Sequence, residues 1–303
     1  MADLQTTITR MLLRRTRYRW ARGSIAEQRR RQEQQARFMP VAKGVCVEPI
    51  TIDRLSAAWI SGPGPTGSTP ARLSTRVVLY LHGGAYALGS ITTHRAFLGR
   101  FATATRTRVL AIDYRLAPEH PFPAALDDAV AAYRWLTSTG HDPARIVIAG
   151  DSAGGGLALA TIVMLRDAGD RLPACAVCFS PWVDLTLSCA SIDTNAEADS
   201  ILNRDGLAGY ARLYTNGHDP RDPLISPLFA DMTGFPPILI HVGGDEILLD
   251  EAVALCDRAR AAGVDAEIEV WPGMFHVFQM VTFLRQSVSS LDHAALFIAR
   301  HLS

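Results

Sequence analysis

Eight short runs of apolar and β-branched residues recur along the chain, and each has the length of a strand. From the third run onward the runs are apolar throughout rather than alternately apolar and polar, which is typical of strands buried on both faces. The runs are GVCVEPI (44–50), SAAWIS (56–61), RVVLYLH (76–82), RVLAIDY (108–114), RIVIAG (145–150), ACAVCFS (174–180), PILIHVG (237–243) and AEIEVW (266–271).

Segments long enough for helices separate the runs from the third onward, for example FPAALDDAVAAYRWL (122–136) and GGLALATIVMLRDAG (155–169). Parallel strands need such crossovers, so this order predicts an α/β fold with an eight-stranded, mostly parallel sheet flanked by helices. The connection between the first two runs is too short for a crossover. We therefore expect these two strands to pair antiparallel at one edge of the sheet.

Two stretches do not follow the alternation of strands and helices. They are residues 1–40 and a long connection at about 183–235, which is rich in Asp, Asn, Pro and Gly. Insertions in an α/β sheet lie over the carboxyl ends of the strands, where ligands bind. We therefore expect the two stretches to form a lid over a ligand site.

The composition is that of a globular protein, with 48% hydrophobic residues, 20% charged residues and no net charge. No apolar stretch approaches the roughly 18 residues that a membrane span requires. The N-terminus is rich in arginine and shows no apolar segment ending in a cleavage site, so no secretory signal is visible. These features predict a cytoplasmic protein without an integral membrane segment.

Charge is unevenly spread, because residues 1–40 contain ten Arg against Asp3, Glu27 and Glu33. Such a segment could contact nucleic acid or an anionic membrane. The rest of the chain adds no long-range attraction for a polyanion, so we favour a solvated helix and predict no nucleic-acid partner. In this interpretation Ile8, Met11, Leu12 and Trp20 pack on the body of the protein.

The sequence contains two short matches to metal-binding or cofactor-binding motifs, but neither has the context that its motif requires. Cys175 and Cys178 form a CxxC, but they lie in an apolar run and no second pair of ligands has zinc spacing. GPGPTG at 62–67 matches GxGxxG, but it contains two prolines and no helical segment follows it. We therefore predict no cofactor and no metal.

A candidate nucleophile lies in GDSAG, residues 150–154, between the run RIVIAG and a helical segment. This is the G-x-S-x-G elbow in its strand–turn–helix context, which would expose the Oγ of Ser152 on a sharp turn. The third run ends in LHGGAY (81–86), whose glycine amides would lie beside that turn. We expect Gly83, Gly84 and Ala153 to donate to an oxyanion, with His82 in a structural role.

A serine nucleophile also requires a histidine and an acid, which follow it in this order along the chain of such folds. His276 lies in PGMFHVF, just past the last run, in a segment that Pro272 and Gly273 mark as a loop. The acid comes from GGDEILLD (243–250), which offers Asp245, Glu246 and Asp250. Adjacent side chains of an extended loop point in opposite directions, so only one of Asp245 and Glu246 can face His276. The residues alone do not decide which of the two is the acid.

From about residue 76 to the C-terminus, the chain resembles the hormone-sensitive-lipase-like α/β-hydrolases, which include bacterial carboxylesterases. The shared elements are LHGGAY, DYRLAPEHPFPA (113–124), GDSAGG (150–155), SPW (180–182), GGDEILLD and His276. Relatives often show an acidic triad residue followed four positions later by Asp, and Glu246 and Asp250 have that spacing. The resemblance thus implies Ser152, Glu246 and His276 as the triad, with Asp250 at the start of the next helix.

The resemblance implies a helical cap, formed by residues 1–40 and an insertion at about 183–235, on a hydrolase domain that covers 41–303. It implies a cofactor-free serine carboxylesterase that acts on esters of short to medium acyl chains. Because residues 1–40 would close over the acyl pocket, we expect Trp20 and Phe38 to line it. Alternatives are a lactone, amide or acetyl-group hydrolase with the same triad, or a ligand-binding relative without catalysis. The family's HGGG is HGGA here. Ala85 still supplies an N–H, so the oxyanion site survives if the backbone there needs no positive φ.

The last run, AEIEVW, would form an exposed edge of the sheet, protected only by Glu267 and Glu269. Exposed edges tend to pair with another strand. We therefore expect a homodimer that forms through this strand, and the resemblance points the same way.

Overall fold

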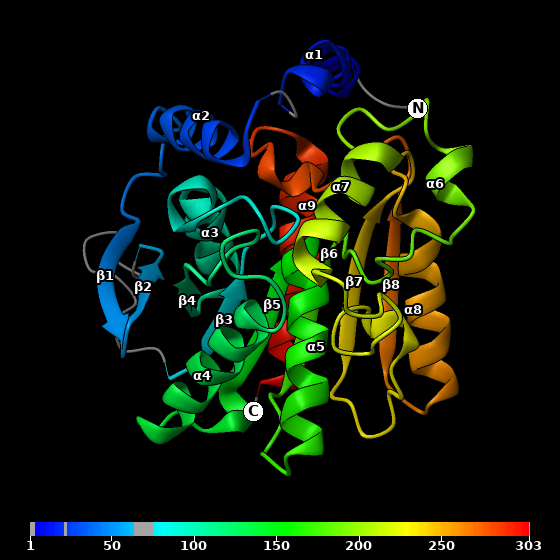
Figure 1. Ribbon diagram of the computed structural model, residues 1–303. Helices are drawn as coiled ribbons and strands as arrows, with labels where there is room; N and C mark the ends of the chain where they lie inside the picture. The colour runs from blue at the N-terminus through cyan, green and yellow to red at the C-terminus, as the bar shows by residue number, and fades with distance from the viewer. Residues whose placement is uncertain (1–3, 21–22, 64–74, 303) are drawn as a thin grey trace.

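The computed structural model describes residues 4–20, 23–63 and 75–302, and for 16–20 only the backbone. Within these residues the centre of the fold is an eight-stranded sheet of order β1-β2-β4-β3-β5-β6-β7-β8 (Figure 1). The strands are β1 (Cys46–Ile52), β2 (Leu55–Ser61), β3 (Val77–Leu81), β4 (Arg108–Ile112), β5 (Ile146–Asp151), β6 (Cys175–Phe179), β7 (Ile238–Gly243) and β8 (Ala266–Trp271). All eight predicted strands are present.

The pairing of the strands also agrees with the prediction. β1 pairs antiparallel with β2, and β2 pairs antiparallel with β4. Every pair from β4 through β3 to β8 is parallel. The mostly parallel sheet with an antiparallel edge is therefore confirmed.

Helices cover both faces of the sheet, because alternate residues of each central strand enter different cores. Val77, Leu79 and Leu81 of β3 pack with α4 and α5, whereas Val78 and Tyr80 pack with α3 and α9. The helices are α1 (Leu4–Trp20), α2 (Ile25–Arg37), α3 (Ile91–Thr105), α4 (Ala124–Ser138), α5 (Ala153–Asp167), α6 (Ser191–Thr194), α7 (Arg204–Thr215), α8 (Leu249–Ala261) and α9 (Arg285–His301). The described residues also form the short 3₁₀ turns η1 (Pro143–Arg145), η2 (Pro227–Phe229) and η3 (Phe278–Met280).

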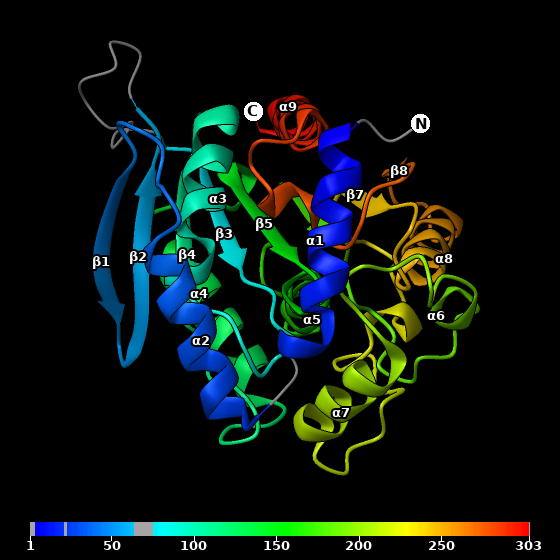
Figure 2. The same cartoon turned by 90° about the horizontal axis from the view of Figure 1, so that it is seen from above.

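The two stretches outside the strand–helix alternation form α1, α2, α6 and α7, with η2 at the end of the second. Figure 2, viewed from above, shows α1 crossing over the start of α5, with α2 on one side and α7 on the other. Contacts hold α2 on the loop after β3: Arg29 Nε donates to the carbonyl of Ala87 at 2.7 Å and its guanidinium pairs with Glu119 at 2.8 Å.

The predicted packing of α1 is wrong. Ile8, Met11 and Leu12 do not pack on the body, because their exposed fractions are 45%, 47% and 54%. The side chain of Trp20 lies outside the described residues. The body-facing side of α1 carries Arg10 instead, since loop carbonyls and a carboxylate lie beneath it and offer partners to a guanidinium.

Other predictions concern the membrane, the cysteines and the 62–67 loop. Among the helices of the described residues, none is long and apolar enough to cross a membrane. Cys175 and Cys178 lie buried in β6, where burial raises the pKa of each thiol to about 12. Most of the 62–67 loop lies outside the described residues.

Candidate active site

Ser152 lies on the turn between β5 and α5 with φ 52° and ψ −123°, a strained conformation for a residue with a side chain. The turn is tight enough to exclude a Cβ on its glycines. A Cβ on Gly150 would collide with the carbonyl of Gly154, and one on Gly154 would collide with the carbonyl of Leu81. The glycines of GDSAG therefore allow the elbow that presents the Oγ of Ser152.

His276 lies in the loop after β8 and meets Ser152 from a distance of 124 positions along the chain. Its Nε2 is 2.9 Å from the Oγ of Ser152. Both residues are nearly buried, with 6% of His276 and 8% of Ser152 exposed. This contact is the geometry that a base needs to take the proton of a serine hydroxyl.

The acid that faces His276 is Glu246, not Asp245. Oε2 of Glu246 lies 3.5 Å from Nδ1 of His276, which is an ion-pair contact rather than a short hydrogen bond. Asp245 points the other way and pairs with Arg10 of α1 at 2.5 Å. Asp250 lies in the first turn of α8 and accepts from the backbone N–H of Ser191 at 2.7 Å.

Burial and the charge of the partner shift the pKa of each residue, Glu246 and His276, in opposite directions. Burial raises the pKa of Glu246, and the nearby His276 acts against this rise. Burial alone would lower the pKa of His276, but the Glu246 carboxylate outweighs burial and raises it. The Glu246 carboxylate therefore stabilises an imidazolium at His276, which is the form that follows proton transfer from serine.

Ser180 connects the glutamate to the histidine loop, and sequence reasoning missed this role. Its Oγ donates to Oε2 of Glu246 at 2.8 Å and accepts from the backbone N–H of Val277 at 3.1 Å. Its φ is +47°, and that of Val277 is also +47°. The only signal in the sequence is a polar residue at the end of a buried strand, in SPW.

The loop after β3 differs from the predicted oxyanion site at Gly83. The backbone N–H of Gly83 donates to Oδ1 of Asp151 at 2.9 Å, so it does not face an oxyanion. Gly84 has φ +124° and Ala85 has φ +53°. The backbone at Ala85 thus does require a positive φ, which costs an alanine about 1–2 kcal/mol relative to its favoured conformations.

Asp151 holds this loop through a buried network behind the elbow. It accepts from the hydroxyl of Tyr80 at 2.8 Å, and Nε2 of His94 lies 3.3 Å from its carboxylate. Burial alone would lower the pKa of His94, but Asp151 outweighs burial and raises it, while His94 lowers the pKa of Asp151. His82 stacks on Tyr114, and burial lowers its pKa to about 3, in keeping with a structural role.

The ion pair of His94 and Asp151 predicts a pH-dependent stability. The raised pKa of His94 means that its contribution is complete below the unfolded value of 6.5 and is lost as pH rises through the folded value. The lowered pKa of Asp151 means that its contribution is complete above 3.8. Replacing His94 by glutamine should therefore lower the melting temperature most at about pH 4–6.5 and progressively less toward pH 9. Thermal melts across this range measure it, and a difference that does not change with pH would contradict it.

A cavity of about 430 Å³ adjoins Ser152 and His276. Its lining is mainly apolar and comes from α1, α2, α7 and the loops after β3 and β8, including Leu13, Met39, Leu88, Ile201, Leu207 and Phe275. Phe38 does not contribute as predicted, because it is 89% exposed and points to solvent. Its neighbours Ala36 and Met39 take that place.

Comparisons with known proteins identify the family of this fold. The α/β hydrolase fold family matches residues 78–280. An acetyl-hydrolase of Streptomyces hygroscopicus is 48% identical over 229 residues, which cover 76% of this chain and 74% of that protein. An esterase of Acinetobacter venetianus is 37% identical over 249 residues, which cover 82% of this chain and 80% of that protein.

Similarity extends over the whole structure. The crystal structure of an esterase from the bacterial hormone-sensitive lipase family superposes with a TM-score of 0.93, at 42% identity and with 100% of both chains covered. The fold, the motifs and these relatives lead to one assignment: the chain belongs to the α/β hydrolases, in their hormone-sensitive-lipase-like branch, as its motifs implied.

Proposed function

We propose that the chain is a serine carboxylesterase whose triad is Ser152, Glu246 and His276. The observation that supports it best is the 2.9 Å contact between Nε2 of His276 and Oγ of Ser152, beside a mainly apolar cavity. An ester hydrolase also agrees with the relatives, which are named esterase and acetyl-hydrolase.

In the proposed reaction His276 takes the proton of Ser152 while Oγ attacks the ester carbonyl. Glu246 holds the imidazole in the correct tautomer and stabilises the imidazolium. His276 then protonates the departing alcohol. In the second half of the reaction His276 takes a proton from water, which attacks the acyl-enzyme and releases the acid from Ser152. The proposed oxyanion donors are the backbone N–H groups of Gly84 and Ala153, since that of Gly83 already donates to Asp151. The N–H of Ala85 joins them, although the Cβ of this residue makes its positive φ costly.

Labelling with a fluorophosphonate, followed by peptide mapping, tests the proposal. We expect a single adduct on Ser152 in the folded protein and none after heat denaturation. Folded protein without an adduct on Ser152 would rule out the esterase and leave a binding protein of the same fold. Hydrolases of lactones, amides and acetylated small molecules use the same triad. Comparing kcat/KM over a panel of such substrates and simple esters distinguishes these activities.

The cavity predicts a preference for short acyl chains. Its volume of about 430 Å³ must hold the acyl group and the alcohol together, and α1 and α2 line it. With p-nitrophenyl esters of two to sixteen carbons as substrates, kcat/KM should be highest at the short end and fall at least about tenfold by the longest chains. A maximum at the long end would contradict this prediction.

The remaining parts of the proposal concern architecture. Residues 1–40 and about 183–235 would serve as the cap of a hydrolase domain that spans 41–303, since α1, α2 and α7 contribute to the cavity beside Ser152. A cytoplasmic location stays a prediction.

We also propose a homodimer that forms through β8. This strand is one end of the sheet order, and its Val270 is 44% exposed. Its carboxylates are occupied within the chain, because Glu267 pairs with Arg300 at 2.7 Å and Glu269 with His293 at 2.8 Å. Paired carboxylates repel a second strand less than free ones do. Light scattering should give twice the chain mass at micromolar concentration, and a monomer there would contradict the proposal.

A further inference from the structure

Helix α1 carries its apolar side chains on the side that faces solvent. Leu4, Ile8, Met11 and Leu12 are 75%, 45%, 47% and 54% exposed. Their spacing of three and four residues places them on one face of the helix. Thr6, which lies on the opposite face, is fully buried. This inverts the usual arrangement of a surface helix, whose apolar stripe faces the core.

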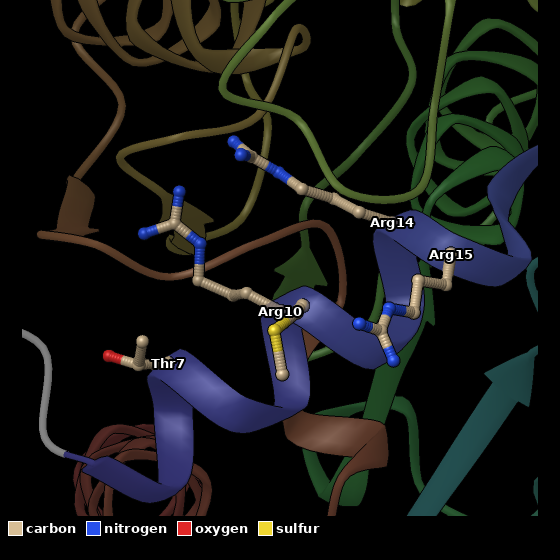
Figure 3. Close-up of a pocket in the computed structure, with 5 residues that line it drawn as sticks. Thr7, Arg10, Arg14 and Arg15 are labelled. Atoms are coloured by element: carbon tan, nitrogen blue, oxygen red, sulfur yellow. The ribbon is translucent and has the colours of Figure 1, made fainter.

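Polar contacts hold the inner side of α1 on the body. Arg10 pairs with Asp245 at 2.5 Å and donates to the carbonyl of Gly273 at 3.3 Å, and Arg14 donates to the carbonyl of Glu197 at 2.8 Å. Figure 3 shows Arg10 and Arg14 reaching from the helix in one direction and Arg15 in another. The apolar face is therefore not needed to dock α1 within this chain.

The outer face of α1 also carries positive charge, and the inner face of the same helix borders the cavity. Arg15 is exposed and follows Leu4, Ile8 and Met11 at helical spacing, so it shares their face. Leu13 of the same helix lines the cavity beside Ser152, as does Met39, which is 48% exposed. Apolar and cationic groups thus lie next to the site that would take an ester.

We propose that the outer face of α1, formed by Leu4, Ile8, Met11, Leu12 and Arg15, docks on an anionic lipid surface. A helix that combines an apolar face with arginines lies in the plane of a lipid interface, where its apolar side chains enter the acyl boundary and its cations meet anionic headgroups. Docking there would bring the cavity to esters that reside in lipid.

The charge of this segment favours lipid over a second copy of the chain. Residues 1–40 contain ten Arg and only three acidic residues. A twofold dimer through the outer face would bring Arg15 of each copy toward the same residue of the other, since Arg10 and Arg14 turn to the body. An anionic lipid surface attracts the same charges.

Vesicle flotation of the full chain tests the proposal, and it uses Ser152→Ala protein so that the result does not depend on ester cleavage. The probes are vesicles of phosphatidylcholine alone and vesicles with about one third phosphatidylglycerol. We expect binding to the anionic vesicles that weakens as salt rises. The triple variant Leu4→Gln/Ile8→Gln/Met11→Gln, which keeps good helix formers, should bind at least about tenfold more weakly.

The matched control is Leu296→Gln, because Leu296 is 67% exposed on α9, outside this face. It should bind the anionic vesicles as the parent protein does. Absence of binding by the parent, or equal binding by the triple variant, would overturn the proposal. A dimeric parent and a monomeric triple variant would also overturn it, because the outer face of α1 would then be an interface with a second copy of the chain. When the same substitutions are made in the chain that retains Ser152, each variant should still cleave a dissolved p-nitrophenyl ester, since none of these side chains lines the cavity.

Discussion

Replacing Glu246 by glutamine is expected to lower kcat by about 10³–10⁴-fold. Glutamine has the same shape, so the hydroxyl of Ser180 keeps an acceptor and the fold should persist. It carries no charge, so it cannot stabilise the imidazolium of His276, whose raised pKa depends on the Glu246 carboxylate. Steady-state kinetics with a short p-nitrophenyl ester measure the loss, and a thermal melt shows that the protein is folded.

Asp245→Asn is the matched control, because it makes the same chemical change one position earlier. Asp245 pairs with Arg10, and 26% of its side chain is exposed, so its charge acts on the position of α1 rather than on His276. We expect kcat to change less than about threefold, in line with the small energy of a partly exposed ion pair. If Asp245→Asn proved severe and Glu246→Gln mild, the assignment of the acid would be reversed.

Removing the hydroxyl of Ser180 is expected to lower kcat about 10- to 100-fold with little change in KM. A hydrogen bond to a charged group contributes about 1.5–3 kcal/mol, and this one holds Oε2 of Glu246 at 2.8 Å. Ser180 is buried and does not line the cavity, so its loss should leave substrate binding intact. The variant is Ser180→Ala, and kcat and KM are measured separately.

A double-mutant cycle distinguishes a positioning role from damage to the fold. If Ser180 acts through Glu246, then Ser180→Ala should cost less than about threefold when Glu246→Gln is already present. Equal losses in both backgrounds would mean that Ser180 does not act through Glu246. Ser61→Ala, which removes another buried serine hydroxyl far away on β2, should leave kcat unchanged.

The fold was predictable because its signals are local. Each strand is a continuous apolar run, and a buried parallel strand has no exposed face that would interrupt it. The same applies to the elbow, because the glycines around Ser152 allow a turn that no Cβ would permit. The packing of α1 was not predictable in this way, since the partners of Arg10 lie at residues 198, 245 and 273.

The candidate site divides along the same line. The contacts of Ser152 with His276 and of His276 with Glu246 agree with the sequence, although the catalytic roles stay a proposal. The spacing to Asp250 that the family resemblance implies distinguished Glu246 from its neighbour Asp245. The direction of the Gly83 N–H could not be read, because it depends on where Asp151 points. Ser180 was missed because a single polar residue at a strand end does not reveal its partner.

The burial of Ser152 and His276 has a chemical consequence for the acyl-enzyme of the proposed reaction. A serine acyl ester reacts with any small hydroxyl compound that His276 can deprotonate, so its chemistry alone does not select water over methanol or glycerol. Access through a mainly apolar cavity therefore decides which acceptor is used. Hydrolysis and transesterification are then two outcomes of one intermediate, and the supply of acceptor at Ser152 sets their ratio.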